Sequence, residues 1–162
     1  MAQQAEDHKT YTRRNSLRLR GFDYAARRIY FVTFVVKGRR NIFSDRRCAQ
    51  AALDAVFELR ERLRFNIYCY CLMPDHFHAL IGLGESGKSL GEICGAFKSV
   101  STRSYWQWHE GRLWQQRFFD HIIRDEKDFY ETMEYIRMNP VRKGLVEKPE
   151  EWPYTGSPDE FG

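Results

Sequence analysis

The sequence lacks a stretch of apolar residues long enough to cross a membrane, which would need about 18 in a row. It also lacks the apolar core of a secretory signal peptide, because its N-terminus is polar and charged. Its 4 cysteines have no disulfide-framework spacing and lie in segments that read as helices and strands. These absences argue against a membrane-spanning or disulfide-stapled protein, and we expect a cytoplasmic protein with buried, reduced thiols.

Negative charge is scarce in the first part of the chain. Between Lys9 and Arg40, ten lysines and arginines accompany a single acid, Asp23. Such positive charge predicts a polyanionic partner, with nucleic acid favoured over a membrane surface; the alternative is a solvated basic tail. The arginines that we expect to contact nucleic acid are Arg13, Arg14, Arg18, Arg20, Arg27, Arg28, Arg39 and Arg40.

The composition fits one compact domain. With 162 residues, of which 43% are hydrophobic, the chain can bury an ordinary core. Residues 1–26 show no clear period and are predicted to be a basic N-terminal arm, whereas residues 27–162 are predicted to form a single domain. The C-terminal tail, which contains Trp152, is expected to pack back on that domain.

Hydrophobic periodicity predicts a mixed α and β fold. The expected elements are a strand at 28–36, a helix from a Ser44 cap to about Arg64, two strands joined by a turn at Pro74-Asp75, a helix opened by a capping box at Ser89 and Glu92, a strand at 118–124 and a helix from Asp125 to about Met138. The last helix is expected to stop at Asn139-Pro140, because proline disfavours helical geometry in the residue before it. This βαββαβ order predicts an α+β, ferredoxin-like antiparallel sheet of four strands with an additional C-terminal helix.

The second strand of the expected hairpin carries two histidines, within the sequence MPDHFH. Side chains alternate along a strand, so His76 and His78 are predicted to share one face while Phe77 takes the other. Such a pair can chelate a metal ion if at least one more ligand comes from elsewhere in the fold. The alternative is a pair of histidines that only form hydrogen bonds within a sheet.

The last helix offers a further ligand. Its polar row, beside an apolar stripe, consists of Asp128, Thr132, Tyr135 and Asn139. Tyr135 and Asn139 are one turn apart, so a helix laid over the open sheet face could bring the Asn139 amide oxygen to a metal on the histidines, with the Tyr135 phenol beside it. In the alternative interpretation, Asn139 is a turn residue before proline and Tyr135 is an ordinary amphipathic side chain.

The segments MPDHFH, LWQQRFFDHIIR and EYIRMNPVRKGLV occur in this order along the chain. In sequence and spacing they resemble the REP-associated tyrosine transposases, which are domesticated relatives of single-strand insertion-sequence transposases in the HUH nuclease superfamily. The resemblance covers about Arg28 to Tyr154. It implies that His76 and His78 bind a metal ion, that Asn139 is a further metal ligand and that Tyr135 is the catalytic nucleophile.

The same resemblance implies a metal-dependent, single-strand-specific DNA endonuclease and strand transferase that acts on palindromic repeat hairpins through a 5′-phosphotyrosine intermediate. The expected metal is Mg²⁺ or Mn²⁺, which would orient the scissile phosphate and neutralise charge. No nucleotide cofactor is expected, because a phosphotyrosine stores the bond energy needed to rejoin strands. The expected partner is single-stranded or hairpin DNA, bound by a monomer or homodimer. The alternative is a non-catalytic nucleic-acid-binding protein with the same fold.

Two motifs suggest other sites. Residues 82–89, GLGESGKS, match the phosphate-loop pattern, but the remaining sequence offers too few strands for the parallel sheet of such folds. Cys69 and Cys71 precede the histidines and suggest zinc. However, Cys69 is predicted to lie opposite Leu80, about 13 Å along the strand from His76. Cys71 could still join the histidines, so the identity of the metal stays open.

Aromatic residues gather after the second expected helix, near basic residues. They are Tyr105, Trp106, Trp108 and Trp114. Their rings could stack on unpaired bases or pack in the core and at the edge of the domain, and the sequence alone leaves both interpretations open.

Overall fold

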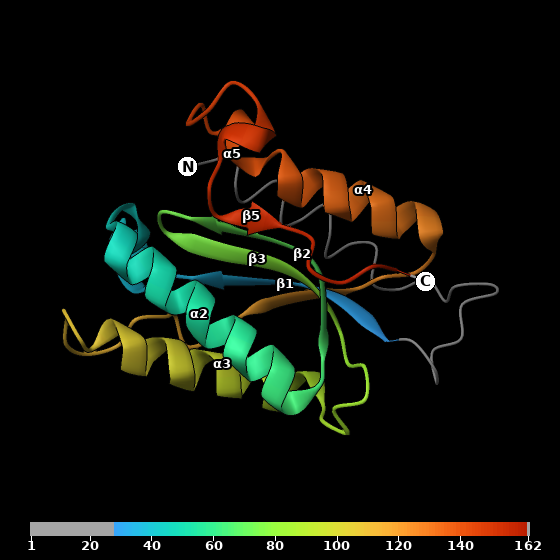
Figure 1. Ribbon diagram of the computed structural model, residues 1–162, viewed down its shortest axis with the longest axis horizontal. Coiled ribbons are helices and arrows are strands. Elements are labelled where there is room, and N and C mark those ends of the chain that lie inside the picture. The colour runs from blue at the N-terminus through green and yellow to red at the C-terminus, as the bar shows by residue number, and fades with distance from the viewer. Residues whose placement is uncertain (1–27, 162) are drawn as a thin grey trace.

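The computed structural model describes residues 28–161, which form a five-stranded antiparallel sheet with helices on both faces (Figure 1). The strands are β1 Ile29–Val35, β2 Asn66–Met73, β3 His76–Gly82, β4 Phe119–Ile122 and β5 Thr155–Gly156, in the spatial order β4-β1-β3-β2-β5. The helices are α2 Arg46–Leu63, α3 Leu90–Tyr105, α4 Glu126–Arg137 and α5 Asn139–Arg142, with 3-10 turns at Lys37–Arg39, Ile42–Ser44 and Pro149–Glu151. The predicted α+β, ferredoxin-like class of fold is confirmed.

β2 and β3 form the predicted hairpin around Pro74-Asp75, and β3 is antiparallel to both β1 and β2. Every residue of β3 is buried, because helices cover both faces of the sheet. Phe77 packs in the core beneath α2 and α3, whereas Leu80 packs in a second core beneath α4. β3 therefore presents alternate side chains to two separate layers.

Side-chain caps define where α2 and α3 begin. The predicted Ser44 cap of α2 is wrong: Asp45 caps this helix, and its carboxylate accepts a hydrogen bond from the Arg47 N–H at 2.9 Å. Ser44 instead ends a 3-10 turn, and the carboxylate that follows it is an equally good cap. At α3 the predicted capping box is present, since Ser89 Oγ accepts from Glu92 N–H at 3.2 Å and the Glu92 carboxylate accepts from Ser89 N–H at 2.8 Å.

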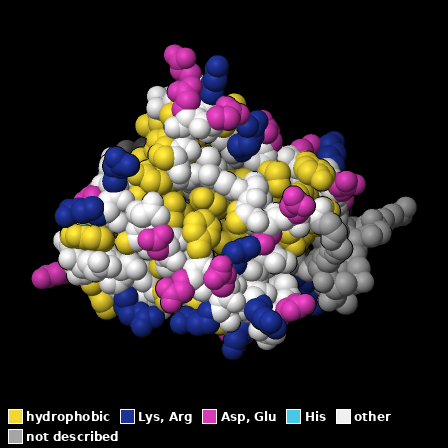
Figure 2. Space-filling model, viewed as in Figure 1, with side chains coloured by type: hydrophobic (Ala, Val, Ile, Leu, Met, Phe, Trp, Pro, Cys, Tyr) yellow, Lys and Arg dark blue, Asp and Glu magenta, His cyan; other side chains and the backbone are white. Residues whose placement is uncertain are grey.

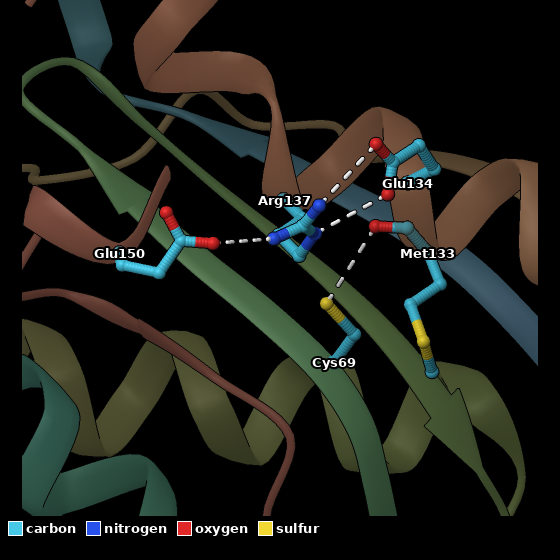
Figure 3. A network of polar contacts seen from close by, with 5 residues as sticks. All are labelled: Cys69, Met133, Glu134, Arg137 and Glu150. Atoms are coloured by element: carbon cyan, nitrogen blue, oxygen red, sulfur yellow. Dashed lines mark hydrogen bonds and ion pairs between the residues drawn. The ribbon is translucent and has the colours of Figure 1, made fainter. Parts of the chain in front are cut away.

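Helices α2 and α3 cover one face of the sheet, and α4 covers the other (Figure 1). The predicted apolar stripe of α4 packs on the sheet: Phe129 and Ile136 are buried in one cluster with Phe31 and Leu80, and Met133 packs against this cluster partly buried. At the end of α4 the Arg137 guanidinium donates to the carboxylates of Glu134 and Glu150, while the Cys69 thiol of β2 lies 3.9 Å from the Met133 carbonyl oxygen (Figure 3). These contacts hold the C-terminal half of α4 over β2.

The expected stop at Asn139-Pro140 is only partly correct. α4 ends at Arg137, but Met138 keeps right-handed helical geometry and α5 follows at once from Asn139. Pro140 lies in the first turn of α5, where the missing N–H would have had no helical partner in any case. The helical path therefore continues past the proline to Arg142.

The C-terminal tail packs back on the domain, as expected, and adds a strand that was not predicted. β5 pairs with β2, with Gly156 opposite Tyr70, and the Trp152 indole donates to the Leu72 carbonyl at 3.0 Å. The sheet therefore has five strands rather than four. This pairing covers part of a β2 edge whose backbone groups would otherwise lack partners.

Packing explains most of the aromatic cluster. Tyr105 and Trp114 are buried in the core beneath α3, and the Trp114 indole donates to Ser101 Oγ at 2.8 Å. The Trp108 ring lies 5.2 Å from the guanidinium carbon of Arg47. Trp106 is the exposed member of the group, with 55% of its surface accessible.

The surface seen in Figure 2 carries lysines and arginines intermixed with acidic residues. This face therefore lacks the broad single-sign charge of a nucleic-acid-binding surface. Across residues 28–161, no helix combines the length and the apolar character that crossing a membrane would require.

Candidate active site

β3 places His76 and His78 side by side on the sheet face that α4 covers. Both side chains are buried, and their ring centroids are 4.6 Å apart. The alternation predicted from the sequence accounts for this, since Phe77 between them points into the opposite core. The strand thus supplies a rigid support for two neighbouring imidazoles.

Each imidazole is held by a hydrogen bond at Nδ1. Asp75 Oδ1 lies 2.6 Å from His76 Nδ1, and Thr33 Oγ1, directly across from His78 on β1, lies 2.7 Å from His78 Nδ1. An ionised carboxylate can only accept, so His76 donates from Nδ1. If His78 likewise donates to Thr33, both rings have Nε2 as the nitrogen that can bind a metal ion.

Asp75 also connects the histidines to a basic turn. Burial raises the pKa of its carboxyl, but the hydrogen bond from His76 and the electrostatic interactions with His76 and with the Arg39 guanidinium outweigh burial and hold that pKa below its ordinary value. The Arg39 guanidinium lies 3.8 Å from Asp75 Oδ2. Asp75 is therefore ionised at neutral pH, as an acceptor for His76 must be.

α4 brings Tyr135 to the same place. The Tyr135 ring is half-buried, and its centroid lies 5.9 Å from the His78 ring centroid and 5.9 Å from that of Phe31. The guanidinium carbon of Arg142, on α5, lies 4.0 Å from the centroid of the Tyr135 ring. The Tyr135 ring thus has both a histidine and a cation as neighbours.

Asn139 begins α5 one turn after Tyr135 and is 2% exposed. Within the described part of the chain its buried Oδ1 has no hydrogen-bond partner. A buried, unsatisfied acceptor costs about 1–3 kcal/mol, which a cation would offset. Two imidazoles and an amide oxygen form a donor set suited to a divalent metal, so the residues present fit the predicted metal ion.

Cysteine does not extend this donor set. Cys69 lies opposite Leu80, as expected, and Cys71 lies opposite His78. Burial, together with the neighbouring Cys69, raises the pKa of the Cys71 thiol to about 12, which disfavours the thiolate that a metal needs. Residues 28–161 contain no group of three or more histidine, cysteine or acidic side chains placed to hold a metal.

The phosphate-loop pattern at residues 82–89 lies in a different structural setting from a nucleotide-binding loop. The strand before it, β3, is antiparallel to both neighbours, whereas such loops follow strands of a parallel sheet. Ser89 Oγ caps α3, and a side chain at Gly84, where φ is +55°, would meet the Arg64 carbonyl oxygen at 2.7 Å. These residues shape a turn and a helix start.

The predicted DNA contacts are divided between described and undescribed residues. The arm at residues 1–26, with Arg13, Arg14, Arg18 and Arg20, and also Arg27, lies outside the described residues. Arg28 and Arg39 are exposed beside the sheet. Arg40 donates to three protein oxygens, those of the Lys37 carbonyl, the Tyr105 hydroxyl and the Arg112 carbonyl, and so also serves the fold.

Sequence reasoning missed three features of this site. Asp75 was interpreted only as a turn residue, although its position next to His76 is a usable signal. Arg142 follows Tyr135 by two helical turns, but the expected break at proline hid that spacing. The third feature is a hydrogen bond of 2.9 Å from His121 Nε2 on β4 to Asp128 Oδ2 on α4, which no sequence pattern indicates.

Comparisons with known proteins show the family to which the chain belongs. A family model described as "Transposase IS200 like" matches residues 25–139. A candidate REP-associated tyrosine transposase of Haemophilus influenzae is 29% identical over 151 residues, covering 82% of this chain and 81% of the relative. The REP-associated tyrosine transposase of Escherichia coli is 26% identical over 126 residues, covering 78% of this chain and 74% of the relative.

The same fold occurs in a solved structure of a REP-associated tyrosine transposase bound to a REP hairpin. It superposes with a TM-score of 0.72 at 24% identity and covers 86% of this chain and 81% of the solved chain. The resemblance noted from the three sequence segments is therefore confirmed. The chain belongs to the IS200-like transposase family and is a DNA transposase enzyme.

Proposed function

We propose that the protein cleaves and rejoins single-stranded DNA at the foot of palindromic hairpins, with Tyr135 as nucleophile and a metal ion bound by His76, His78 and Asn139. One observation carries the proposal. Two buried imidazoles lie side by side on β3 with the half-buried phenol of Tyr135 next to one of them, and one turn after Tyr135 the buried Asn139 oxygen has no hydrogen-bond partner among residues 28–161. A domain that only bound DNA would have no need for this arrangement.

The chain's own residues prepare the site. Asp75 and Thr33 fix the two imidazoles, so that the ligand nitrogens need little rearrangement when a metal arrives. When bound, Mg²⁺ or Mn²⁺ would supply Lewis-acid polarisation of the scissile phosphate. Tyr135 shares a continuous helical path with Asn139, so the nucleophile and one ligand are positioned together.

In the cleavage step the Tyr135 hydroxyl oxygen attacks the scissile phosphorus. A bond from this oxygen to phosphorus forms, the bond from phosphorus to the 3′ oxygen breaks, and the phenolic proton is balanced by the proton that the 3′ oxygen gains. The products are a 5′-phosphotyrosine and a free 3′-hydroxyl. The reverse attack by a 3′-hydroxyl rejoins strands, and no nucleotide cofactor is required.

The substrate class rests on the relatives. The solved neighbour of this fold is bound to a REP hairpin, and two relatives are REP-associated tyrosine transposases by name. We therefore propose hairpin DNA as the partner, bound by a monomer or homodimer in the cytoplasm. Arg28, Arg39 and Arg40 are the predicted phosphate contacts within the described residues.

A cleavage assay tests this function. The substrates are labelled hairpin oligonucleotides with randomised single-stranded feet, incubated with the protein and Mn²⁺ after removal of bound metal by chelation. Cleavage with a free 3′-hydroxyl is expected only when metal is restored, and His78→Ala should abolish cleavage while hairpin binding largely persists. Lys88→Ala, in the phosphate-loop pattern, is the control and should cleave normally. Hairpin binding without cleavage under any metal would instead indicate a non-catalytic DNA-binding protein.

A further inference from the structure

Arg142 lies against the proposed nucleophile. Its guanidinium carbon is 4.0 Å from the centroid of the Tyr135 ring, well within the distance of about 6 Å at which a cation and an aromatic ring attract each other. The Arg142 residue as a whole is exposed. The cation therefore lies on the solvent side of the site, from which DNA would approach.

The backbone fixes this placement. Met138 keeps helical geometry between α4 and α5, and Arg142 N–H donates to the Met138 carbonyl at 2.9 Å. Residues seven apart on a helical path return to nearly the same side, so Arg142 is above Tyr135. The pairing thus follows from the continuation of the helix past Pro140.

Arg142 has no acidic partner among residues 28–161, in contrast to several other arginines. Arg137 pairs with Glu134 and Glu150 (Figure 3), and Arg60 pairs with Asp159. The positive charge of Arg142 also opposes the rise in the pKa of Cys71, which lies opposite His78. An uncompensated cation therefore lies near both the phenol and the histidine strand.

We propose that Arg142 is a catalytic residue that binds the scissile phosphodiester, and then the phosphotyrosine, at Tyr135. This inference rests on the proposed function. As the Tyr135 oxygen bonds to phosphorus and the 3′ oxygen departs, negative charge accumulates on the non-bridging phosphate oxygens. A guanidinium presents a planar fork of N–H donors that matches two such oxygens and is always charged. Placed beforehand, it stabilises this charge without reorganisation during the reaction.

Binding measurements test the contact without relying on catalysis. The probe is a hairpin selected by covalent capture with the wild-type protein, prepared either with its natural scissile phosphodiester or with an uncharged methylphosphonate at that position. Full-length Tyr135→Phe protein, which cannot cleave, should prefer the phosphodiester by about tenfold, since hydrogen bonds to a charged group are strong. In Tyr135→Phe/Arg142→Gln this preference should disappear. Tyr135→Phe/Lys143→Gln loses the same amount of charge at the neighbouring residue, and this variant should keep the preference for the phosphodiester.

Rates provide the second measurement. Single-turnover cleavage by Arg142→Gln should be about 100-fold slower than by the wild-type protein, Arg142→Lys should recover part of the loss, and Lys143→Gln should match the wild type. A wild-type rate for Arg142→Gln, or a phosphodiester preference that survives this substitution, would overturn the role of Arg142. If the wild-type protein captures no hairpin at all, the proposed function itself fails, and this inference fails with it.

Discussion

Asn139 is a residue whose surroundings a ligand would explain. Its side chain is buried at the start of α5, yet its oxygen has no hydrogen-bond partner within residues 28–161. His76 and His78 differ from Asn139 in this respect, because each has a hydrogen bond at Nδ1. A metal ion would supply the partner that the Asn139 side-chain oxygen lacks.

This difference predicts how the metal affects stability. Mn²⁺ at about 100 times its Kd should raise the free energy of unfolding of the wild-type protein by about 2.7 kcal/mol. Asn139→Ala removes a ligand and should lose most of that rise, measured as thermal unfolding with and without Mn²⁺. Asn66→Ala, at the far end of β2, is the matched control and should keep the rise. An undiminished metal effect in Asn139→Ala would show that this amide is not a ligand.

Some residues of the candidate site could be predicted from the sequence, and others could not. His76 and His78 were predicted to share a face because strand alternation needs no tertiary information, and the spacing of Tyr135 and Asn139 is a helical one. The pairing of His78 with Thr33 depends on sheet register, which a single sequence does not determine. The position of Arg142 near Tyr135 depends on a helical path that continues past Pro140, which the sequence analysis did not predict.

Helix α4 is anchored at both ends, which matters because it carries Tyr135. At its start, the buried Asp128 carboxylate accepts hydrogen bonds from His121 Nε2 and from the Arg124 N–H, each at 2.9 Å. At its end, Arg137 pairs with Glu134 and Glu150. The exposed pairs of Arg137 contribute little, so we expect the buried contacts of Asp128 to dominate.

The anchor at Asp128 predicts a pH-dependent stability. Burial raises the pKa of this carboxyl, but the hydrogen bonds from His121 and the Arg124 N–H, with the electrostatic interactions of the His121 and Arg124 side chains, hold that pKa below its ordinary value. A lowered pKa means that the stabilisation is present above the unfolded-state pKa of about 4 and is lost as pH falls through the folded-state pKa. Asp128→Asn should therefore cost about 3 kcal/mol at pH 7 and progressively less below pH 4, measured by urea unfolding.

An exposed carboxylate provides the control for this measurement. Asp54→Asn, on the outer face of α2, should change the free energy of unfolding by less than about 0.5 kcal/mol at either pH. A cost of Asp128→Asn that stays constant from pH 7 to pH 3 would contradict the proposed ionised anchor.

Long elements were predictable and short ones were not. α2, α3 and the central strands have enough residues to show a hydrophobic period, and the capping box of α3 is a local signal. β5 has two residues and α5 has four, too few for any period, and both exist because they pack on β2 and its neighbours. Tertiary contacts, rather than local propensity, form these elements.

The two faces of the sheet have different roles, since one carries the larger hydrophobic core and the other carries the candidate active site. α2 and α3 form an aromatic and aliphatic core on one face, whereas α4 and α5 cover the face with the histidines (Figure 1). The ferredoxin-like class followed from element order alone. The sheet face that α4 covers is established by the side chains buried in the two layers, although the polar row of this helix had suggested the same face.

The basic arm yields a prediction for the whole chain. Replacing Arg13, Arg14, Arg18 and Arg20 with glutamine should weaken hairpin binding. The slope of log affinity against log salt should fall by roughly 0.7 to 0.9 for each phosphate that the variant no longer neutralises, measured by binding titrations at several salt concentrations. Replacing Arg46, Arg62, Arg103 and Lys127 with glutamine, which removes the same four charges from the exposed surfaces of α2, α3 and α4, is the control for net charge. An unchanged slope for the arm variant would identify the arm as a solvated tail.

The most direct test is to locate the covalent bond between protein and DNA. Tyr130 lies on the same helix as Tyr135, is 51% exposed and is rotated by about 140° from it, so the two tyrosines provide a matched pair. Mass spectrometry of a denatured reaction should find the DNA 5′ end attached to Tyr135. Tyr135→Phe should remove the adduct while folding and hairpin binding survive, and Tyr130→Phe should leave the adduct in place. An adduct on Tyr130, or undiminished cleavage by Tyr135→Phe, would contradict the proposed role of Tyr135.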